Sequence, residues 1–569
     1  MVKNIGLVKG IHTFVFMLVI ASSLVLDLFV VHMTANKATT ASLHTTQTAS
    51  LHSNHSKSTS GLAGIGLTLT SNTLKTPPFT KPTSSTQGSP TTAPTQPTTN
   101  TGPVVTNNAP ISNATPTFNN YPMYMYDPEH NNYNPTETAI TTTTAPNLKQ
   151  LWNIQVGPPN QTPFYKYGVS DQPVEYNNVL YWGSWDGNMH ATNISTHQDI
   201  WTTNLGVTTD ANCSPTQAGV GSTATVRQVS INGVQTPVVF VGGGDANVYA
   251  LNANTGAVIW KTPLGQSPNT FLWSPVVLSN GYVYIGKSSF GDCPLVHAGL
   301  FQLNWSTGAI AHVFNTEPVT PNNCTGSSIW GAPTIDRSKN TVYFATGNPG
   351  WCPNTSNVPA SGVYGYSIVE VQANNVSTLV GDWQVPQSQL GADNDFGSTP
   401  TLFYAGSKPM VGIGGKNGFY YAFQRDNLGA GPVWQDQIAI GGNCPDCGDG
   451  TLSAAAWDGT YLYVAGGKTT IAGVSAHGAV RAVNPSTGAY IWEHPFTKGA
   501  VLGAVSAIPG VIVVDEANSV DVINSKTGAE LIQLTPPGNS SVLDGPDMII
   551  NGVLYFGDLN GNLYAYQPM

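Results

Sequence analysis

The chain has 569 residues, of which only 9% are charged, and its formal net charge is −10 at pH 7. Ordinary soluble domains carry roughly 25% charged residues, so neutral amides and hydroxyls must cover much of this surface. The acidic balance and the scattered lysines and arginines exclude a nucleic-acid-binding footprint, which needs a clustered basic patch. A surface that titrates so little is compatible with an acidic external habitat. A glycosylated extracellular protein would have the same composition.

An apolar stretch from Ile11 to Met33 follows Lys3 and Lys9. A membrane span needs about 20 apolar residues, so the stretch is long enough, although Asp27 lies within it. A cleaved signal peptide and an uncleaved signal anchor both fit, and the length favours the anchor. Because the lysines precede the span, everything after Met33 is expected outside the cell. Residues 1–33 are therefore predicted to export the protein, which is then either secreted or anchored in the membrane through this segment.

Residues 34–145 are rich in Thr, Ser and Pro and poor in large apolar side chains. Such a segment cannot bury enough apolar surface to offset its chain entropy, so it predicts a disordered, mucin-like stalk. The aromatic cluster YPMYMYDPEHNNYNP near Tyr121 is a candidate to pack onto the folded domain. Glycosylation sequons, which suit a surface protein, occur at Asn54, Asn113, Asn193, Asn304, Asn375 and Asn539.

Six cysteines in an exported chain indicate disulfides. One pair flanks a predicted strand pair, a second lies in a C-P-D-C loop, and a third is formed by the two that remain. A redox or metal role is the alternative for the C-P-D-C loop, but neither a second C-x-x-C nor a histidine cluster accompanies it. Gly448 follows the loop where a haem attachment site needs histidine. The predicted pairs are Cys324–Cys352, Cys444–Cys447 and Cys213–Cys293.

Beyond residue 145, short runs of β-branched and aromatic residues alternate with Gly, Asn and Asp turns, which predicts strands and hairpins. A repeat recurs there, and its clearest copy is VYALNANTGAVIW, from Val248 to Trp260. In each copy the Asn side chain can bond its own turn and Gly can take a positive φ. The Trp is a large apolar plate that can fill the space between sheets. We assign to core packing the repeat tryptophans Trp201, Trp260, Trp434 and Trp492.

Each copy predicts one four-stranded antiparallel blade, which needs neighbours to bury both of its faces. The copies count to an all-β, eight-bladed β-propeller over residues 146–569, whose last blade lacks an outer strand. The segment LKQLWNIQV, from Leu148 to Val156, has the pattern of an orphan outer strand. We expect it to complete the last blade and close the ring, which removes exposed edges. The blades are expected to begin near Val169, Thr216, Phe271, Ile329, Phe396, Thr451, Val501 and Leu543.

The Tyr-Ala-x-Asn-x-x-Thr-Gly-x-x-x-Trp repeat resembles the pyrroloquinoline-quinone (PQQ) repeat of quinoprotein alcohol dehydrogenases, from about Leu148 to Met569. The same repeat forms the non-enzymatic propeller of the outer-membrane barrel-assembly lipoprotein. The repeat is therefore specific for the fold, and an activity must be argued from a site. Three segments are similar to polyvinyl-alcohol dehydrogenase-like members: IWGAPTIDRSKNTVYFATGNPGW, GADNDFGSTPTLF and GGKNGFYYAFQRDNLG.

In these three segments the resemblance implies an active site. Asn348 matches the asparagine that binds the family's active-site calcium, and Asp393 matches the catalytic aspartate. Lys416 matches the basic residue that contacts the quinone. Asp395, two residues after Asp393, is assigned with Lys416 to cofactor binding. The resemblance thus implies that Asn348 and Asp393 are metal ligands and that Asp393 is also the catalytic base.

A fourth segment, YIGKSSFGDC, departs from the family pattern. The family supplies a glutamate calcium ligand there, whereas this chain has Ser288 and Ser289. Asp292 follows a few positions later and is assigned as the substitute metal ligand. The vicinal cysteine pair that stacks on the quinone in many family members is absent, because Cys293 stands alone.

Calcium polarises a quinone carbonyl in such a site, a carboxylate takes the alcohol proton, and a lysine stabilises developing negative charge. The resemblance therefore implies an exported, PQQ- and calcium-dependent dehydrogenase of small-molecule or polymer alcohols, with an external electron acceptor. The alternative is a propeller that has lost the cofactor and binds cell-surface proteins or glycans from its stalk. The missing glutamate, set against the retained Asn348, Asp393 and Lys416, is the discriminating feature. Neither function involves nucleic acid, and membrane contact is expected through the N-terminal segment only.

Overall fold

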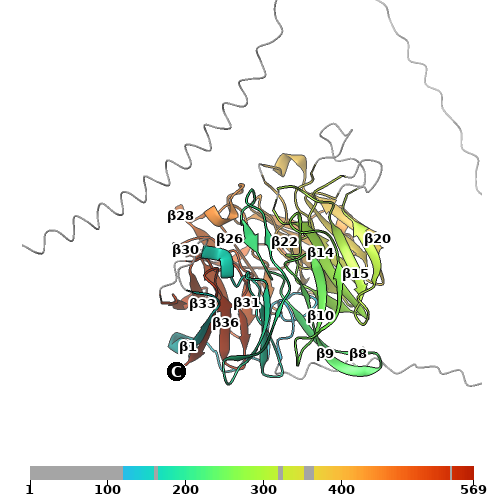
Figure 1. Cartoon of the computed structure of the whole chain (residues 1–569). Coiled ribbons are helices and arrows are strands. Elements are labelled where there is room, and N and C mark those ends of the chain that lie inside the picture. The colour runs from blue at the N-terminus through green and yellow to red at the C-terminus, as the bar shows by residue number, and fades with distance from the viewer. Residues whose placement is uncertain are drawn as a thin grey trace, which may run out of the picture. The chain divides into compact units, whose positions relative to one another are not determined.

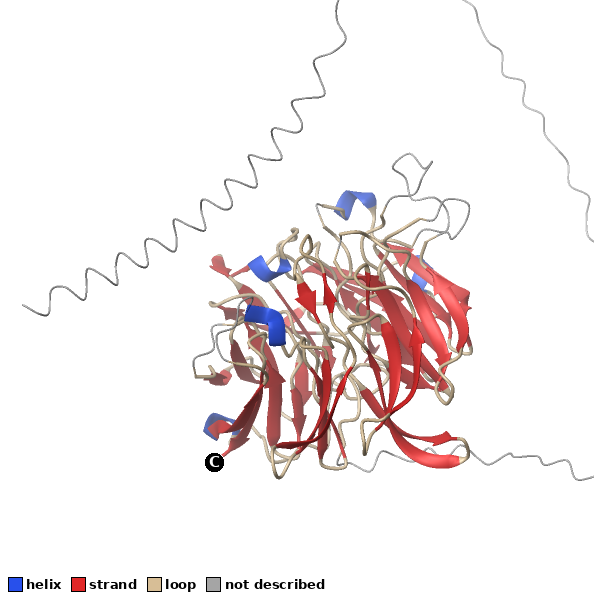
Figure 2. Cartoon of the chain, viewed as in Figure 1, coloured by secondary structure: helices blue, strands red, loops and turns tan. Residues whose placement is uncertain are grey.

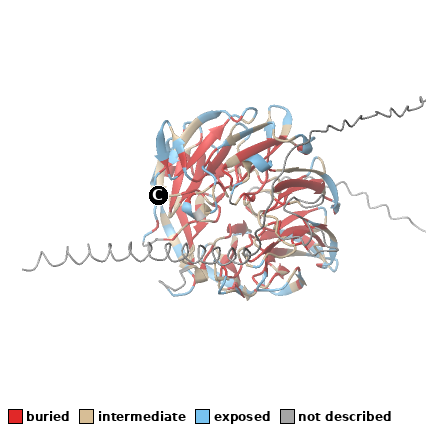
Figure 3. Cartoon of the chain, turned by 90° about the horizontal axis from the view of Figure 1, so that it is seen from above, coloured by how far each residue is buried: buried red, intermediate tan, exposed pale blue. Residues whose placement is uncertain are grey.

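The computed structural model describes residues 120–158, 164–291, 293–317, 324–350, 364–391, 393–537 and 541–569. Their strands form eight antiparallel blades arranged around a central axis (Figure 1, Figure 3), which confirms the predicted propeller. No helix in these ranges is long and apolar enough to cross a membrane. The predicted anchor, residues 1–33, lies outside the described residues. The described helices are short 3-10 turns (Figure 2): η1 (Ala145–Asn147), η2 (Phe164–Tyr167), η3 (Gln387–Gln389), η4 (Leu428–Ala430) and η5 (Pro445–Cys447).

The blades follow one another along the chain, and each is a meander of four strands. The first strands of neighbouring blades contact one another, so these strands lie nearest the axis. Blade 1 comprises β2 (Val174–Tyr176), β3 (Val179–Gly183), β4 (Asn188–Asn193) and β5 (Gln198–Asn204); blade 2 comprises β8 (Thr225–Ile231), β9 (Val234–Gly242), β10 (Asn247–Asn252) and β11 (Val258–Pro263). Blade 3 comprises β13 (Val277–Ser279), β14 (Tyr282–Ser289), β15 (Gly299–Asn304) and β16 (Ile310–Asn315); blade 4 comprises β17 (Thr334–Asp336), β18 (Thr341–Ala345), β19 (Ser367–Gln372) and β20 (Asn375–Gln384).

The second half of the ring repeats this plan, and additional short strands decorate the loops. Blade 5 comprises β21 (Thr401–Ala405), β22 (Lys408–Gly414), β23 (Phe419–Gln424) and β24 (Trp434–Gln437); blade 6 comprises β25 (Ala456–Trp457), β26 (Leu462–Gly466), β29 (Gly478–Val483) and β30 (Tyr490–Phe496). Blade 7 comprises β31 (Ser506–Ile508), β32 (Val511–Glu516), β33 (Ser519–Asn524) and β34 (Glu530–Leu534); blade 8 comprises β35 (Met548–Ile550), β36 (Val553–Gly557), β37 (Asn562–Pro568) and β1 (Leu148–Gln155). The additional strands are β6 (Thr208–Thr209), β7 (Gln217–Ala218), β12 (Thr270–Phe271), β27 (Thr469–Ile471) and β28 (Val474–Ala476).

Each repeat tryptophan joins its blade to the turn of the next blade. The indole N–H of Trp201 donates to the carbonyl of Ala253 at 2.8 Å, in the Asn-x-x-Thr-Gly turn of the following repeat. The glycine of that turn, Gly256, has a φ of +70°, and a Cβ there would lie 2.7 Å from the Trp201 ring. Glycine is therefore required twice, by its backbone conformation and by the approaching ring. The same contacts recur at Trp260, Trp434 and Trp492, so their predicted packing role is confirmed.

The strand predicted to close the ring does so. β1 pairs antiparallel with β37, in a register that runs from Leu148 opposite Pro568 to Gln155 opposite Asn562. The last blade therefore takes its outermost strand from the N-terminal side of the propeller. This pairing covers the edge that β37 would otherwise expose.

The packed chain begins before the predicted domain start at residue 146. We call residues 120–144 the strap, because its backbone bonds to successive blades in order. Tyr121 exchanges backbone hydrogen bonds with Glu175 of blade 1, and later strap carbonyls accept from Ile335 of blade 4 and Leu402 of blade 5. The expected packing of the aromatic cluster onto the folded domain is thus confirmed. The remaining bonds to the first strands run from the N–H groups of Val226 to Pro122, Trp457 to Asn131 and Ala507 to Asn132, and from the N–H of Asn134 to the carbonyl of Ala507.

The strap places one side chain at the centre of the ring. Met125 is fully buried among Ala454 of blade 6 and Ala504 of blade 7, and its backbone N–H donates to Gln172 Oε1 at 2.7 Å. Left-handed backbone at a non-glycine residue costs about 1–3 kcal/mol, so the surrounding contacts must hold the strap in shape. The strap residues with positive φ are Met125, Tyr126, His130 and Asn132.

The strap marks one end of the blades. It bonds at the turns between first and second strands, where Gly552 N–H donates to Glu137 Oε2 at 2.8 Å and Asn177 N–H donates to Asn120 Oδ1 at 2.9 Å. In an antiparallel blade the turns between second and third strands lie at the other end. Loops that follow the second strands therefore surround the mouth of the ring opposite the strap.

Candidate functional site

The predicted site residues stand in loops at the end of the ring opposite the strap. Asn348 follows β18 in blade 4, and Lys416 follows β22 in blade 5. Asp393 and Asp395 lie in the connection from β20 to β21, which enters blade 5 from the same end. The loops at the junction of blades 4 and 5 thus supply all four side chains.

Four of the five predicted residues come together in one cluster, which we call the site cluster. Lys416 Nζ lies 3.0 Å from Asp393 Oδ2 and 2.7 Å from Asp395 Oδ1, and the second contact is an ion pair outside hydrogen-bond geometry. Asn348 Nδ2 donates to Asp393 Oδ1 at 2.8 Å. The backbone N–H of Lys416 also donates to the carbonyl of Asp395 at 3.1 Å, which ties the two loops of blade 5 together.

The two aspartates have different protonation behaviour although they share one lysine. Burial alone would raise the pKa of Asp393, but the Lys416 charge and the hydrogen bonds from Asn348 and Lys416 hold it below its ordinary value. Burial raises the pKa of Asp395 to about 7, against the pull of Lys416 and with a further push from Asp393. The two carboxylates outweigh burial at Lys416 and raise its pKa. Asp393 is therefore ionised at neutral pH, while Asp395 titrates close to it.

Trp330 joins this cluster and was missed in the sequence. Lys416 Nζ lies 5.1 Å from the centroid of the Trp330 ring, within cation–π range. A Cβ on Gly397 would lie 2.1 Å from the same ring, so only glycine fits beneath it. Trp330 opens the IWGAPTID segment, outside the Trp position of the repeat. That placement was the signal that distinguished it from the packing tryptophans.

In blade 3, the described residues of the segment YIGKSSFGDC bond to neighbours outside the site cluster. Ser288 Oγ donates to the carbonyl of Phe271 at 2.9 Å, and Ser289 Oγ accepts from the N–H of Val296 at 3.0 Å. Both serines are buried, and their hydroxyl groups form hydrogen bonds within blade 3. Asp292, the predicted substitute ligand, lies outside the described residues, so its role stays a prediction.

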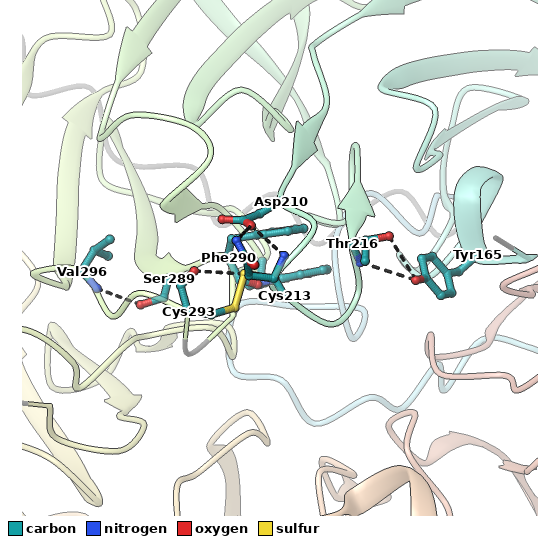
Figure 4. Close-up of a disulfide and its surroundings, with 10 residues drawn as sticks. Tyr165, Asp210, Cys213, Thr216, Ser289, Phe290, Cys293 and Val296 are labelled. Carbon is teal, nitrogen blue, oxygen red and sulfur yellow. Dashed lines mark hydrogen bonds between the residues drawn. A yellow bond between two sulfur atoms is a disulfide. The ribbon is translucent and has the colours of Figure 1, made fainter. Parts of the chain in front are cut away.

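A disulfide joins this part of blade 3 to the connection between blades 1 and 2. Cys213 and Cys293 are bonded (Figure 4), as predicted. Cys213 is anchored by its N–H to the carbonyl of Asp210 at 3.2 Å, and Val296 bonds to Ser289 on the other side of the bridge. The Cys444–Cys447 pair is also confirmed. Cys324 is disulfide-bonded too, while its predicted partner Cys352 lies outside the described residues.

The oxygen atoms available to a cation in the site cluster are an amide oxygen and two carboxylates. Asn348 Oδ1 is buried and has no hydrogen-bond partner among the described residues, so it is an available oxygen ligand for a cation. Hard cations such as calcium bind carboxylate and amide oxygens, usually six to eight of them. Within the described ranges no group of three or more His, Cys, Asp or Glu side chains is placed to hold a metal ion.

Comparisons with known proteins place the fold in a family. The family model "Glucose/ethanol/alcohol dehydrogenase, beta-propeller domain" matches residues 121–267, and the model "Outer membrane protein assembly factor BamB" matches residues 217–349 and 426–569. The chain carries PQQ repeats and is similar to β-propellers of the quinoprotein alcohol dehydrogenase-like group. Each model matches less than half of the chain, and together they extend over much of the ring.

Its curated relatives are distant. A polyvinylalcohol dehydrogenase from Pseudomonas sp is 22% identical over 418 residues, covering 66% of this chain and 61% of the relative. A second, from Sphingopyxis sp. (strain 113P3), is 25% identical over 313 residues, covering 46% of each. The chain thus spans about half to three fifths of the length of these relatives.

Solved structures support the fold alone. A quinohemoprotein alcohol dehydrogenase from Pseudomonas putida HK5 superposes with a TM-score of 0.63 at 16% identity, covering 79% of this chain and 80% of that one. A europium-containing methanol dehydrogenase superposes with a TM-score of 0.61 at 13% identity, covering 79% of this chain and 98% of that one.

Proposed function

We propose that this propeller is an exported PQQ-dependent dehydrogenase that oxidises small-molecule or polymer alcohols and passes the electrons to an external acceptor. The observation that carries the proposal is the convergence of Asn348, Asp393, Asp395 and Lys416 on one cluster. These residues come from three separate segments that resemble the enzymes.

The cluster fits the cofactor that the resemblance implies. Trp330 is only partly buried and is a flat ring beside a cation, which is the environment that a planar, anionic quinone needs. Asn348 Oδ1 and the two carboxylates would hold a hard cation beside the quinone site. When bound, the quinone accepts the hydride and the cation polarises its carbonyl.

The side chains have distinct tasks in this proposal. Asp393 is ionised at neutral pH and takes the proton of the substrate hydroxyl. Asn348 holds the Asp393 carboxylate by its Nδ2–H and so orients it. Lys416 keeps its proton and brings a fixed positive charge to the place where negative charge develops. Trp330 positions the cofactor plane and excludes water from one side.

The test is reconstitution of the full chain. PQQ is added with Ca²⁺, and in a parallel series with Eu³⁺ because one structural neighbour contains europium. Binding is measured by fluorescence quenching and calorimetry, and turnover by dye reduction with primary alcohols and with polyvinyl alcohol. We expect PQQ binding in the micromolar range and alcohol-dependent dye reduction. Failure of PQQ to bind at tens of micromolar with either cation would overturn the proposal.

The variant Asp393→Asn distinguishes a role of Asp393 as the catalytic base from a role in binding the cofactor. Asn keeps the shape of the side chain and one acceptor oxygen but cannot take up the substrate proton, so we expect PQQ binding within a few-fold of wild type and turnover lowered at least 100-fold. Asp426→Asn, an exposed position on blade 5, is the matched control and should leave both unchanged. Turnover retained in Asp393→Asn would reject Asp393 as the base.

A second function is favoured by the blade 3 segment. Ser288 and Ser289 occupy the position of the family's glutamate and bond to the protein, and the Lys416 ammonium already supplies a positive charge to Asp393 and Asp395. A propeller that has given up the cofactor would bind cell-surface proteins or glycans instead. That propeller would show no PQQ binding in the reconstitution, which separates the two functions directly. The disulfides support an extracellular site of action for both.

A further inference from the structure

A second group of buried acidic side chains lies where the ring closes. Asp515 is the second-last residue of β32 in blade 7, Asp547 immediately precedes β35 of blade 8, and Asp171 lies three residues before β2 of blade 1. All three are at most 2% exposed. We call Asp171, Asp515, Asp521 and Asp547 the seam cluster, because it spans both interfaces of the closing blade.

Hydrogen bonds to one backbone carbonyl connect blade 8 to both of its neighbours at the seam. The carbonyl of Asp547 accepts from Gln172 Nε2 of blade 1 at 2.6 Å and from Ser506 Oγ of blade 7 at 2.8 Å. Gly503 and Gly545 let the neighbouring loops touch, since a Cβ on Gly503 would lie 2.6 Å from the carbonyl of Gly545. Asp547 is therefore fixed between its two neighbours by its backbone rather than by its carboxyl group.

The carboxyl oxygens of the seam lack hydrogen-bond donors. Among the described residues nothing donates to either oxygen of Asp515 or Asp547. Asp171 accepts one bond, from the N–H of Gly183 at 2.7 Å, and its other oxygen is unpartnered. Asp521 accepts from Gln533 Nε2 at 2.9 Å through one oxygen only. An ionised carboxylate buried in this way is very costly, so the native fold needs these groups to be neutral.

The charged groups that face the seam are almost all acidic. Asp515 is faced by Asp547, Asp521 and Asp544, and Asp544 also faces Asp171. Around Asp521 stand Glu516, Glu530 and a single cation, Lys498, whose Nζ bonds to Ser519 Oγ at 2.6 Å. Repulsion between these groups adds to the cost of burial and opposes their ionisation.

We propose that the closing blade is held by protonated carboxyl groups, so that the ring is firmly closed in acid and loosens at the seam as the solution becomes alkaline. Protons neutralise the seam cluster, and among the described residues Lys498, beside Asp521, is the one cation that faces it. The acidic external habitat compatible with the composition is the condition in which such a seam is stable.

The direction of the pH effect follows from proton linkage. Burial first, and the acidic neighbours second, raise the pKa of Asp515 well above its ordinary value, and burial does the same at Asp171 and Asp547. Burial raises the pKa of Asp521 to about 7. A free aspartate has a pKa of about 4, so the stability contribution is complete below pH about 4 and is lost as pH rises through the folded-state values. The seam is therefore strongest below pH 4 and weakens through neutrality.

The wild-type full chain supplies the first test. Infrared spectroscopy at pH 6 is expected to show the C=O stretch of protonated carboxyl groups, because exposed carboxyl groups are ionised there. Hydrogen–deuterium exchange at pH 4, 6 and 8, corrected for intrinsic rates, should lose protection between pH 6 and 8 in β1, β35 and β37, at least tenfold more than in blades 2 and 3. Absence of the protonated band, or a uniform loss of protection around the ring, would overturn the proposal.

Variants assign the effect to the seam. Asp515→Asn combined with Asp547→Asn keeps the shape and removes the titration, so we expect seam protection at pH 8 to rise at least tenfold above wild type with little change at pH 4. Asp547→Asn alone, the milder change, should give an intermediate gain. Asp426→Asn, exposed on blade 5, is the control and should follow wild type. Unchanged pH dependence in the double variant would reject the seam as the cause.

A bound metal ion would neutralise the same carboxylates. One further experiment distinguishes a metal ion from protons. The exchange series is repeated at pH 8 with Ca²⁺ and with EDTA. If protons hold the seam, neither addition restores protection. Restoration by Ca²⁺ in wild type but not in the double variant would overturn the proposal in favour of a metal-held seam.

Discussion

The site cluster and the seam cluster are built from equivalent loops but handle negative charge in opposite ways. Both draw on the end of a second strand and on the connection that enters the next blade. In blade 5 a lysine stands beside two carboxylates, at 3.0 and 2.7 Å. At the seam the neighbours of Asp515 are other aspartates. The comparison teaches that burial and a neighbouring cation act together: beside Lys416 the less buried Asp393 is ionised at neutral pH, while Asp395 and the seam carboxyl groups have raised pKa values.

Lys416→Met gives the largest expected effect, because it turns the site cluster into a copy of the seam. Two buried carboxylates lose their cation, so we expect the free energy of unfolding at pH 7 to fall by about 3–5 kcal/mol. The loss should shrink at pH 4, where protonation relieves the repulsion. Chemical denaturation at both pH values measures it, with the exposed Lys408→Met of the same blade as control. Equal losses at the two pH values would contradict this account.

Asp393→Asn tests the ionised member of the pair. Charge-assisted hydrogen bonds are worth about 1.5–3 kcal/mol, so we expect a loss of that size at pH 7. The pKa of Asp393 is lowered in the folded chain, so its contribution is present above pH about 4 and is lost as pH falls through the folded value. The difference from wild type should therefore vanish in strong acid, as followed by denaturation at pH 7 and pH 2. A difference that persists in acid would mean that packing, and not the ion pair, is responsible.

Asp395→Asn should have the smallest effect. Because the pKa of Asp395 is raised to about 7, the group mostly holds its proton at pH 6, and a neutral amide then changes stability by no more than about 0.5 kcal/mol. As pH rises through 7, wild type loses stability and the variant does not, so thermal unfolding should favour the variant by pH 9. A variant that is much less stable at pH 6 would show that Asp395 is ionised there, like Asp393.

Most of the fold was predictable because the residues that form the packing contacts between blades recur at fixed positions in the repeat. Asn, Gly and Trp at fixed spacing set the turn and its contact with the next blade, as at Gly256 and Trp201. The same counting exposed the missing outer strand, and LKQLWNIQV supplied it. The strap was only partly foreseen, since its left-handed residues Met125 and Tyr126 carry no glycine signal and are held by contacts from distant blades.

The residues of the candidate site were predictable from the sequence, but their burial and protonation states were not. The resemblance identified Asn348, Asp393, Asp395 and Lys416, and the structure brings them together. Sequence alone did not reveal that Asp393 and Asp395 differ in protonation, because that depends on burial and on the position of one ammonium group. The seam cluster carries no motif at all. Its aspartates look like ordinary turn residues until the ring brings three blades together.

The pairing of β1 with β37 also dictates an order of events during synthesis. β1 is made first, yet its partner runs to Pro568 at the other end of the propeller. Until that residue has emerged, β1 has an open edge and the growing ring remains a gapped arc. Completion of the fold is thereby coupled to synthesis of β37, so a product truncated before that strand would be left with an unpaired strand that quality-control machinery can recognise.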